Sequence, residues 1–284
     1  MTFSNDSKIL IIQTIALDAL KEIQRICRQN DIKFYLRGGS VMGAIKYNGF
    51  VPWDDDTDIS VPRPDYDRFI EVFSSHWSDK YWLATYRNGD AIHSYFPRLL
   101  LREEYREKMN LEPNNHLGLT ILDVLPLDGV PGSGLGRTIF NYTVMYYRLL
   151  GAVHTVRYKD TISQHKGARK AIINFLYKLN IQRLYTQEWT YERLDKIYRQ
   201  QDFNSALWLG TITGSSVEKE IFQREVFGDG ILHKFEDTEF RIPAMSDDYL
   251  KQIYGRDYLT EIPNVKKSHQ MKNAKIGRAS CRER

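Results

Sequence analysis

The first half of the chain combines a helical pattern with several short strand-like segments. Apolar residues recur at intervals of three and four between residues 7 and 30, which predicts an amphipathic helix. Pro62 and Pro64 end one of the strand-like runs, and Asp65 opens a second amphipathic helix. A run rich in β-branched and aromatic residues predicts a strand at residues 32–36. Further strand-like runs lie at residues 57–61, 81–86, 98–102 and 119–125.

The second half of the chain has a different pattern. Residues 135–200 are mostly helical in period and rich in basic side chains, and mixed structure returns from Ala206. We predict a strand end at residues 240–243 and a short helix at residues 247–254. A strand-rich half followed by a helical half predicts an α+β fold.

Composition excludes several classes of protein. Of the 284 residues, 42% are hydrophobic, so the chain can form a sizeable core and is not disordered throughout. Its two cysteines, Cys27 and Cys281, cannot build a disulfide scaffold or a four-cysteine zinc site, which fits a reducing cytoplasmic setting. No stretch approaches the roughly 20 apolar residues of a spanning helix. The net charge of +4 comes with no nucleic-acid motif, so nucleic acid is not an expected partner.

An acidic cluster is the most informative feature of the sequence. Four carboxylates lie within five positions, in the run Trp53-Asp54-Asp55-Asp56-Thr57-Asp58. On a strand, Asp56 and Asp58 share a face, as do Asp54 and Asp56 if the strand begins early. Paired carboxylates suit a hard cation such as Mg²⁺ or Mn²⁺. The alternative is a solvated acidic loop, but the apolar strand that follows favours a metal site.

A glycine turn and a distant aspartate extend this hypothesis. Gly38 and Gly39 would let backbone amides approach a phosphate, and Ser40 would cap the short helix that follows. Asp123 is a lone acid inside an apolar strand, which makes it the best candidate for a third carboxylate. We assign Asp128, in Leu127-Asp128-Gly129, to a turn.

Basic residues near these motifs could neutralise phosphate groups. The candidates are Lys46, Arg63 and Arg98, although each taken singly is better explained as a surface or structural residue.

These motifs together resemble those of the LicD family, which includes fukutin and fukutin-related protein. The resemblance is carried first by residues 37–59, from Arg37-Gly38-Gly39-Ser40 to the acidic cluster. It continues in residues 63–69 and in residues 122–131, and it closes with Tyr254-Gly255-Arg256-Asp257-Tyr258-Leu259 before Pro263. It spans roughly residues 15–270.

The resemblance implies a nucleotidyltransferase-like fold, with a small mixed sheet flanked by helices. It implies a phosphotransferase that uses a divalent metal, Mg²⁺ or Mn²⁺, to move a substituted phosphate from a CDP-activated alcohol to a glycan hydroxyl. Phosphocholine from CDP-choline is the favoured cargo, with ribitol or glycerol phosphate as alternatives. The acceptor would be teichoic acid, capsule, lipopolysaccharide or a lipid-linked glycan.

The motif assigns roles residue by residue. Asp56, Asp58 and Asp123 would be catalytic metal ligands, and Asp54 a further ligand or a second-layer residue. The donor phosphates would contact a set of glycine, hydroxyl and basic residues: Gly38, Gly39, Ser40, Lys46 and Arg63. A choline headgroup would need an aromatic cage, for which Tyr47 and Trp53 are candidates.

The pattern of the chain, together with the resemblance, divides it into parts. Residues 1–134 would form the catalytic core, residues 135–205 a basic helical insert, and residues 206–275 the segment that completes the same domain. Residues 276–284 continue no pattern of the chain and resemble a non-native cloning tail.

The charge is distributed unevenly. Residues 157–200 hold ten Lys and Arg against four Asp and Glu, so this basic segment could contact an anionic membrane surface or an anionic acceptor, or simply be solvated. We expect a cytoplasmic protein that contacts the inner face of the cytoplasmic membrane peripherally.

Three other functions remain open: an Asp-x-Asp metal-dependent glycosyltransferase, a true nucleotidyltransferase that releases pyrophosphate, and a non-catalytic binding module.

Overall fold

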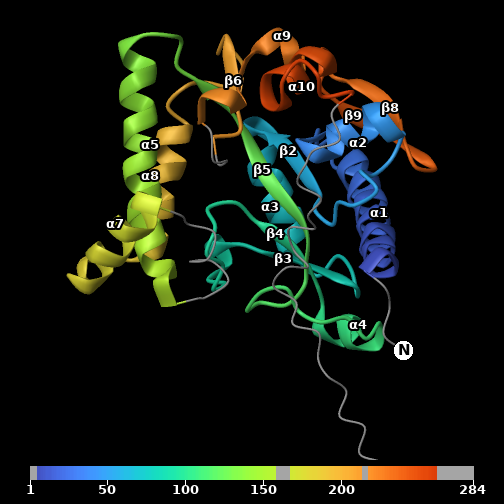
Figure 1. Cartoon of the computed structure of the whole chain (residues 1–284), viewed down its shortest axis with the longest axis horizontal. Coiled ribbons are helices and arrows are strands. Elements are labelled where there is room, and N and C mark those ends of the chain that lie inside the picture. The colour runs from blue at the N-terminus through green and yellow to red at the C-terminus, as the bar shows by residue number, and fades with distance from the viewer. Residues whose placement is uncertain (1–4, 158–166, 213–216, 261–284) are drawn as a thin grey trace, which may run out of the picture.

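A mixed β-sheet forms the centre of the molecule (Figure 1). The computed structural model describes residues 5–157, 167–212 and 217–260. The strands of the main sheet are β1 (Tyr35–Leu36), β2 (Asp58–Pro62), β3 (Tyr81–Ala84), β4 (Arg98–Leu101), β5 (Thr120–Val130), β6 (Trp208–Gly210) and β7 (Ile221–Gln223). A separate hairpin consists of β8 (Ile231–Phe235) and β9 (Thr238–Ile242).

The long strand β5 organises the sheet. Its first part lies between β2 and β4, in the strand order β1-β2-β5-β4-β3. The β2–β5 pair is parallel, and the β1–β2, β4–β5 and β3–β4 pairs are antiparallel. The last residues of β5 pair with β6, which in turn pairs with β7. One strand therefore connects the sheet that carries the acidic residues to the C-terminal part of the chain.

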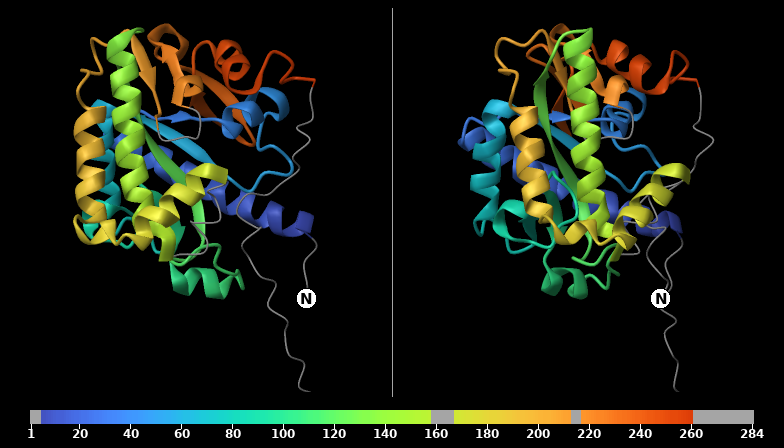
Figure 2. Two further views of the ribbon diagram at one scale, coloured as in Figure 1. Left: turned by 60° about the vertical axis from the view of Figure 1, so that its left-hand side comes forward. Right: turned by 90° about the vertical axis from the view of Figure 1, so that its left-hand side faces the viewer.

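Helices cover this sheet and extend it at one end. They are α1 (Asn5–Gln29), α2 (Gly39–Tyr47), α3 (Arg63–Ser74), α4 (Glu103–Lys108), α5 (Leu135–His154), α7 (Gly167–Lys178), α8 (Gln187–Tyr198), α9 (Arg224–Phe227) and α10 (Ser246–Tyr254). Helices α5 and α8 lie side by side on the opposite side of β5 from α1 (Figures 1 and 2). The β8–β9 hairpin and α10 gather around α2.

Of the three apolar clusters among the described residues, two hold these layers together. The larger core joins the buried face of α1, including Leu20 and Ile23, to Ile59 of β2 and Phe69 of α3. The smaller core joins α5 and α8 to the end of β5, with Val144 and Leu194 almost fully buried. The predicted α+β class is thus confirmed. The predicted domain boundaries stay a prediction.

The predicted turn at Asp128 is wrong. Strand β5 continues through Asp128 to Val130, and Asp128 is 1% exposed. Its carboxylate accepts hydrogen bonds from the Arg63 guanidinium, which compensates a charge that would otherwise be costly inside a sheet. Local sequence favoured a turn, and a partner 65 residues away overrode it.

No helix in the described ranges is long and apolar enough to cross a membrane.

Candidate active site

A glycine turn places the start of α2 against the acidic cluster. Gly38 has a φ of 53°, in the left-handed region that favours glycine, and its N–H donates to the Tyr249 hydroxyl at 3.0 Å. A Cβ on Gly39 would lie 2.9 Å from Oδ2 of Asp54. The two glycines therefore allow the backbone of the turn and the Asp54 carboxylate to approach each other closely.

Ser40 does not cap the helix, contrary to our prediction. Helix α2 begins at Gly39, and its N-cap residue Gly38 makes no side-chain cap bond. The left-handed conformation of Gly38 lets the chain enter the helix directly, which places Ser40 inside the first turn. Its hydroxyl instead accepts a hydrogen bond from the Asp58 N–H at 3.3 Å. Ser40 thereby fastens the glycine turn to the start of β2.

Two predicted carboxylates stand next to each other across the sheet. Asp58 of β2 is the register partner of Asp123 on β5, and Arg98 of β4 is the partner of Asp123 on its other side. The Arg98 Nε lies 3.2 Å from Asp123 Oδ1. The sheet thus brings together Asp58 and Asp123, which are 65 residues apart in sequence, and adds a guanidinium to the same cross-strand row.

The loop that carries Asp54 and Asp56 is held from α1. The Gln13 side-chain amide donates to the carbonyl oxygens of Val51 at 3.0 Å and Asp54 at 2.8 Å. Strand β2 begins only at Asp58, but an alternation of burial extends before it: Asp55 and Thr57 are buried, whereas Asp56 and Asp58 are half-buried. Asp56 and Asp58 therefore follow the predicted period of two, although Asp56 precedes the strand.

Arg37 and Glu220 complete the electrostatics of the site. The Arg37 guanidinium donates to Oε2 of Glu220 at 2.6 Å, to Oδ2 of Asp58 at 3.3 Å, and to the Thr211 hydroxyl at 2.8 Å. Burial raises the pKa of Asp58 to about 7. Arg37 opposes this shift, while the Asp123, Asp54 and Glu220 carboxylates add to it. Burial also raises the pKa of Asp123, against the opposing effect of Arg98.

This electrostatic pattern fits a divalent cation. The neighbouring carboxylates make Asp58 costly to ionise, and a shared cation would relieve that cost. As arranged here, no three His, Cys, Asp or Glu side chains of residues 5–157, 167–212 and 217–260 form a ready metal cage. The metal-ligand roles of Asp54, Asp56, Asp58 and Asp123 stay predictions, supported by the chemistry of the Asp58–Asp123 pair.

The predicted aromatic candidates lie together. The Tyr47 and Trp53 rings pack edge to face, with centroids 6.0 Å apart, and the Lys46 ammonium lies 5.7 Å from the Tyr47 ring centroid. Trp53 directly precedes Asp54, so this aromatic pair borders the acidic loop. Their role in holding a choline headgroup stays a prediction.

Arg63 lies away from the carboxylate pair. Its guanidinium is buried and donates to both oxygens of Asp128, to Oδ1 of Asp195 at 3.0 Å and to the Tyr95 hydroxyl at 3.2 Å. Arg63 thereby connects α3 to β5 and α8, which is a structural role. Nothing in these contacts supports the predicted phosphate contact.

Sequence reasoning missed several groups at the site. Arg37 lies in the motif that resembles the family, but the sequence analysis assigned it no function. A basic residue directly before a glycine turn could have indicated a functional residue. Glu220 and the α10 tyrosines Tyr249 and Tyr254 come from distant parts of the chain. A Cβ on Gly38 would lie 3.6 Å from the Tyr254 hydroxyl and 3.7 Å from Asp58 Oδ2. Only the fold brings these groups to the glycine turn.

The predicted features in the C-terminal tail, from Pro263 to Arg284, lie outside the described residues.

The fold and the site define an α+β protein with paired aspartates on adjacent parallel strands beside a glycine turn. Residues 31–122 match a family described as LicD/FKTN/FKRP, nucleotidyltransferase domain. This stretch contains the glycine turn, the acidic cluster and the first residues of β5. Over these residues the chain resembles the LicD family, as its motifs predicted.

The chain is also similar to individual proteins. The chain is 23% identical over 267 residues to the lipopolysaccharide cholinephosphotransferase LicD of Haemophilus influenzae, covering 93% of this chain and 96% of that protein. Shorter similarities reach two uncharacterized Rickettsia proteins. One, of Rickettsia typhi, is 30% identical over 53 residues, 19% of this chain and 17% of that protein. The other, of Rickettsia prowazekii, is 33% identical over 46 residues, 16% of this chain and 17% of that protein.

Proposed function

We propose that the protein is a phosphotransferase that moves a substituted phosphate from a CDP-activated alcohol to a hydroxyl of a cell-surface glycan. The observation that carries this proposal is the pairing of Asp58 with Asp123 across β2 and β5, beside the turn at Gly38 and Gly39. The name of the Haemophilus relative supports phosphocholine as the cargo and lipopolysaccharide as the acceptor. CDP-choline is therefore the favoured donor.

Mg²⁺ or Mn²⁺ would be held by Asp58 and Asp123, with Asp54 and Asp56 near them. Bound there, the metal would stabilise negative charge on the phosphate oxygens. Asp58 and Asp123 are register partners on adjacent strands, which supports a shared ion. The backbone at Gly39 would contact a donor phosphate oxygen at the start of α2, where the helix dipole favours anions.

The remaining residues would orient the reaction. An oxygen of the acceptor hydroxyl bonds to the phosphorus that carries the alcohol, and the bond from that phosphorus to the CMP oxygen breaks. CMP leaves with that electron pair. Asp123 would orient the hydroxyl and take its proton, a role supported by the burial that raises the pKa of its carboxyl. Arg98 would offset charge on the same side.

The test is CMP release from a panel of CDP-choline, CDP-ribitol and CDP-glycerol, with Mg²⁺ and lipopolysaccharide as acceptor. We expect release with one donor, and a loss of at least about a hundredfold in rate for Asp58→Asn, because a lost charge contact to the transition state costs several kcal/mol. Asp248→Asn, an exposed aspartate on α10, is the matched control and should keep the wild-type rate.

Two results would overturn the proposal. One is a full rate with normal metal dependence in the Asp58→Asn protein. The other is a product with a glycosidic bond in place of a phosphodiester, which would identify a glycosyltransferase. Absence of CMP release from all three donors would count against the donor class.

We also propose that the protein works in the cytoplasm, at the inner face of the membrane. The basic segment between β5 and β6 supports this placement, since anionic lipid headgroups attract such segments.

A further inference from the structure

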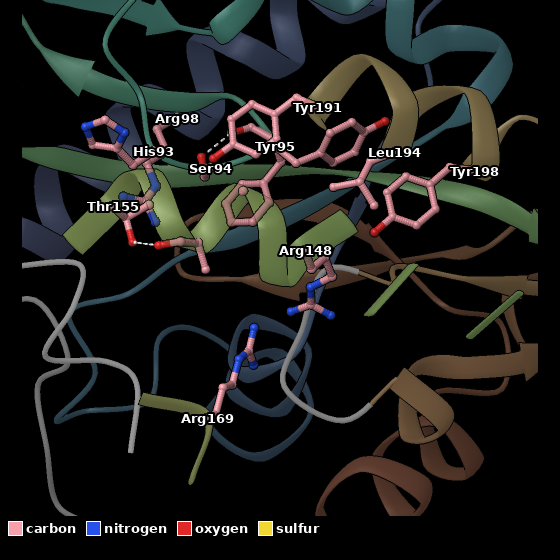
Figure 3. Close-up of a pocket in the computed structure, with 13 residues that line it drawn as sticks. His93, Ser94, Tyr95, Arg98, Arg148, Thr155, Arg169, Tyr191, Leu194 and Tyr198 are labelled. Carbon is pink, nitrogen blue, oxygen red and sulfur yellow. Dashed lines mark hydrogen bonds between the residues drawn. The ribbon is translucent and has the colours of Figure 1, made fainter. Parts of the chain in front are cut away.

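A second feature adjoins the carboxylate pair, on the side away from the glycine turn. A cavity of about 200 Å³ lies among the segment before β4, α5, α7 and α8 (Figure 3). Its wall includes Tyr191 and Leu194 of α8, which provide apolar surface. Arg98, the residue that contacts Asp123, also lines it. Arg98 therefore links the cavity to the row of residues proposed to carry the chemistry.

The charge of this cavity is one-sided. Three arginines line it, Arg98 of β4, Arg148 of α5 and Arg169 of α7, and no described lining residue is acidic. Arg148 and Arg169 point toward each other in Figure 3. Partial burial of the Arg169 guanidinium and the nearby Arg148 charge both lower its pKa, although the residue as a whole is exposed. Guanidinium groups held near each other repel, which costs free energy. A bound anion would turn this repulsion into attraction between each guanidinium and the anion.

The strand order places this cavity relative to the reaction. Along the sheet, the glycine turn after β1 comes first, then Asp58 on β2, Asp123 on β5 and Arg98 on β4. The carboxylate pair therefore has the glycine turn on one side and, on the other, Arg98, which lines the cavity. If the donor phosphates lie at the glycine turn, the opposite side faces the incoming acceptor.

We propose that the cavity lined by Arg98, Arg148 and Arg169 binds a phosphate-type oxyanion carried by the acceptor glycan. This inference rests on the proposed function and names the chemical class of its acceptor, an anionic sugar. Arginine suits the role because its planar fork binds a phosphate through two parallel hydrogen bonds. Arg148 is also anchored, since its Nη1 donates to the Ile212 carbonyl oxygen at 3.4 Å.

Inorganic phosphate is the probe, titrated by calorimetry into the full-length chain without donor or metal. We expect measurable phosphate binding that Arg169→Gln and Arg148→Gln each weaken about tenfold, as expected for loss of a hydrogen bond between charged groups. Lys170→Gln is the matched control, because Lys170 neighbours Arg169 on α7 but does not line the cavity. It should change the affinity less than twofold.

A competition arm separates the acceptor from the donor. CMP added at saturation should leave phosphate binding unchanged if the cavity serves the acceptor. Competitive displacement by CMP would assign the arginines to the donor and overturn the proposal, as would undetectable phosphate binding or unchanged affinity in both arginine variants. Arg169 is exposed on α7, so Arg169→Gln gives a result even if Arg148→Gln fails to fold.

These measurements involve no turnover. Failure of phosphate binding would leave CMP release untouched. Failure of CMP release with normal phosphate binding would overturn the proposed function alone.

Discussion

Single glycines decide how closely the backbone of α2 meets its neighbours. A Cβ on Gly39 would meet Oδ2 of Asp54, the end of a side chain that can move. A Cβ on Gly43 would lie 2.4 Å from the Gly49 carbonyl oxygen and 3.0 Å from the Val51 nitrogen, both backbone atoms. Both glycines lie in α2. Gly39 contacts the proposed site, whereas Gly43 packs against the backbone of the loop that follows the helix.

We predict that Gly39→Ala and Gly43→Ala separate activity from stability. Gly39→Ala should keep the free energy of unfolding within about 1 kcal/mol, because alanine favours a helix, while CMP release falls as Asp54 is displaced. Gly43→Ala should lose about 1–3 kcal/mol through overpacking against fixed backbone. Urea unfolding and CMP release measure the two effects. Full activity in Gly39→Ala would contradict the role of this close approach.

Much of the site could be predicted at this scale. A lone acid in an apolar strand was enough to select Asp123, and the acidic cluster selected Asp58. Arg63 shows the limit of the same reasoning. A basic residue beside a motif suggested a phosphate contact, but its partners Asp128 and Asp195 lie far along the chain and occupy its guanidinium.

Helices α5 and α7 expose apolar side chains that no other described element covers. On α5, Leu135, Ile139 and Tyr142 are 75%, 57% and 70% exposed and fall on one face, opposite the buried Phe140 and Val144. The other exposed apolar side chains on this part of the chain are Met145, Tyr146, Ile172, Phe175, Leu179 and Leu184. Residues 167–187 also contain four Lys and Arg and no acid. Basic and apolar side chains on a surface helix are typical of contact with an anionic lipid surface.

We predict that this surface binds vesicles rich in phosphatidylglycerol. The double variant Phe175→Ser with Leu179→Ser should weaken vesicle binding at least about tenfold in a flotation assay, because each apolar side chain withdrawn from lipid costs about 1.5–3 kcal/mol. Added salt should weaken binding further by screening the basic residues.

The control carries the same change elsewhere. Ile231→Ser with Leu232→Ser removes two exposed apolar side chains from β8, 44% and 52% exposed, and should leave vesicle binding unchanged. Equal binding by both double variants and the wild type would rule out the lipid surface.

At the scale of the whole molecule, a buried ion network ties the helical part to the sheet. Arg63 at the start of α3 is held by Asp128 of β5 and Asp195 of α8, and its guanidinium lies 4.9 Å from the Tyr66 ring centroid. Asp195 also accepts from the Tyr95 hydroxyl at 2.5 Å. Hydrogen bonds from Arg199 and Arg87 bring the pKa of Asp67 well below its usual range, although burial opposes this.

We predict that Arg63→Met lowers the free energy of unfolding by about 3–5 kcal/mol, because it leaves the Asp128 carboxylate buried without its partner. Arg68→Met on the same helix, with a side chain 50% exposed, should cost less than about 1 kcal/mol. Urea unfolding measures both. The folded Arg63→Met protein should keep its donor KM, and a large rise in that KM would show that Arg63 binds phosphate after all.

The sequence by itself determined the α+β class, the order of most helices and strands, the acidic cluster and the resemblance to the LicD family. It could do so because hydrophobic period, glycine and proline positions and a dense motif are local properties of the chain. The tertiary structure decided which residues meet: Asp58 beside Asp123, Arg37 between Asp58 and Glu220, Asp128 inside β5, and three arginines around one cavity. These pairings depend on strand order and on the desolvation of charges, which act between residues far apart in the chain.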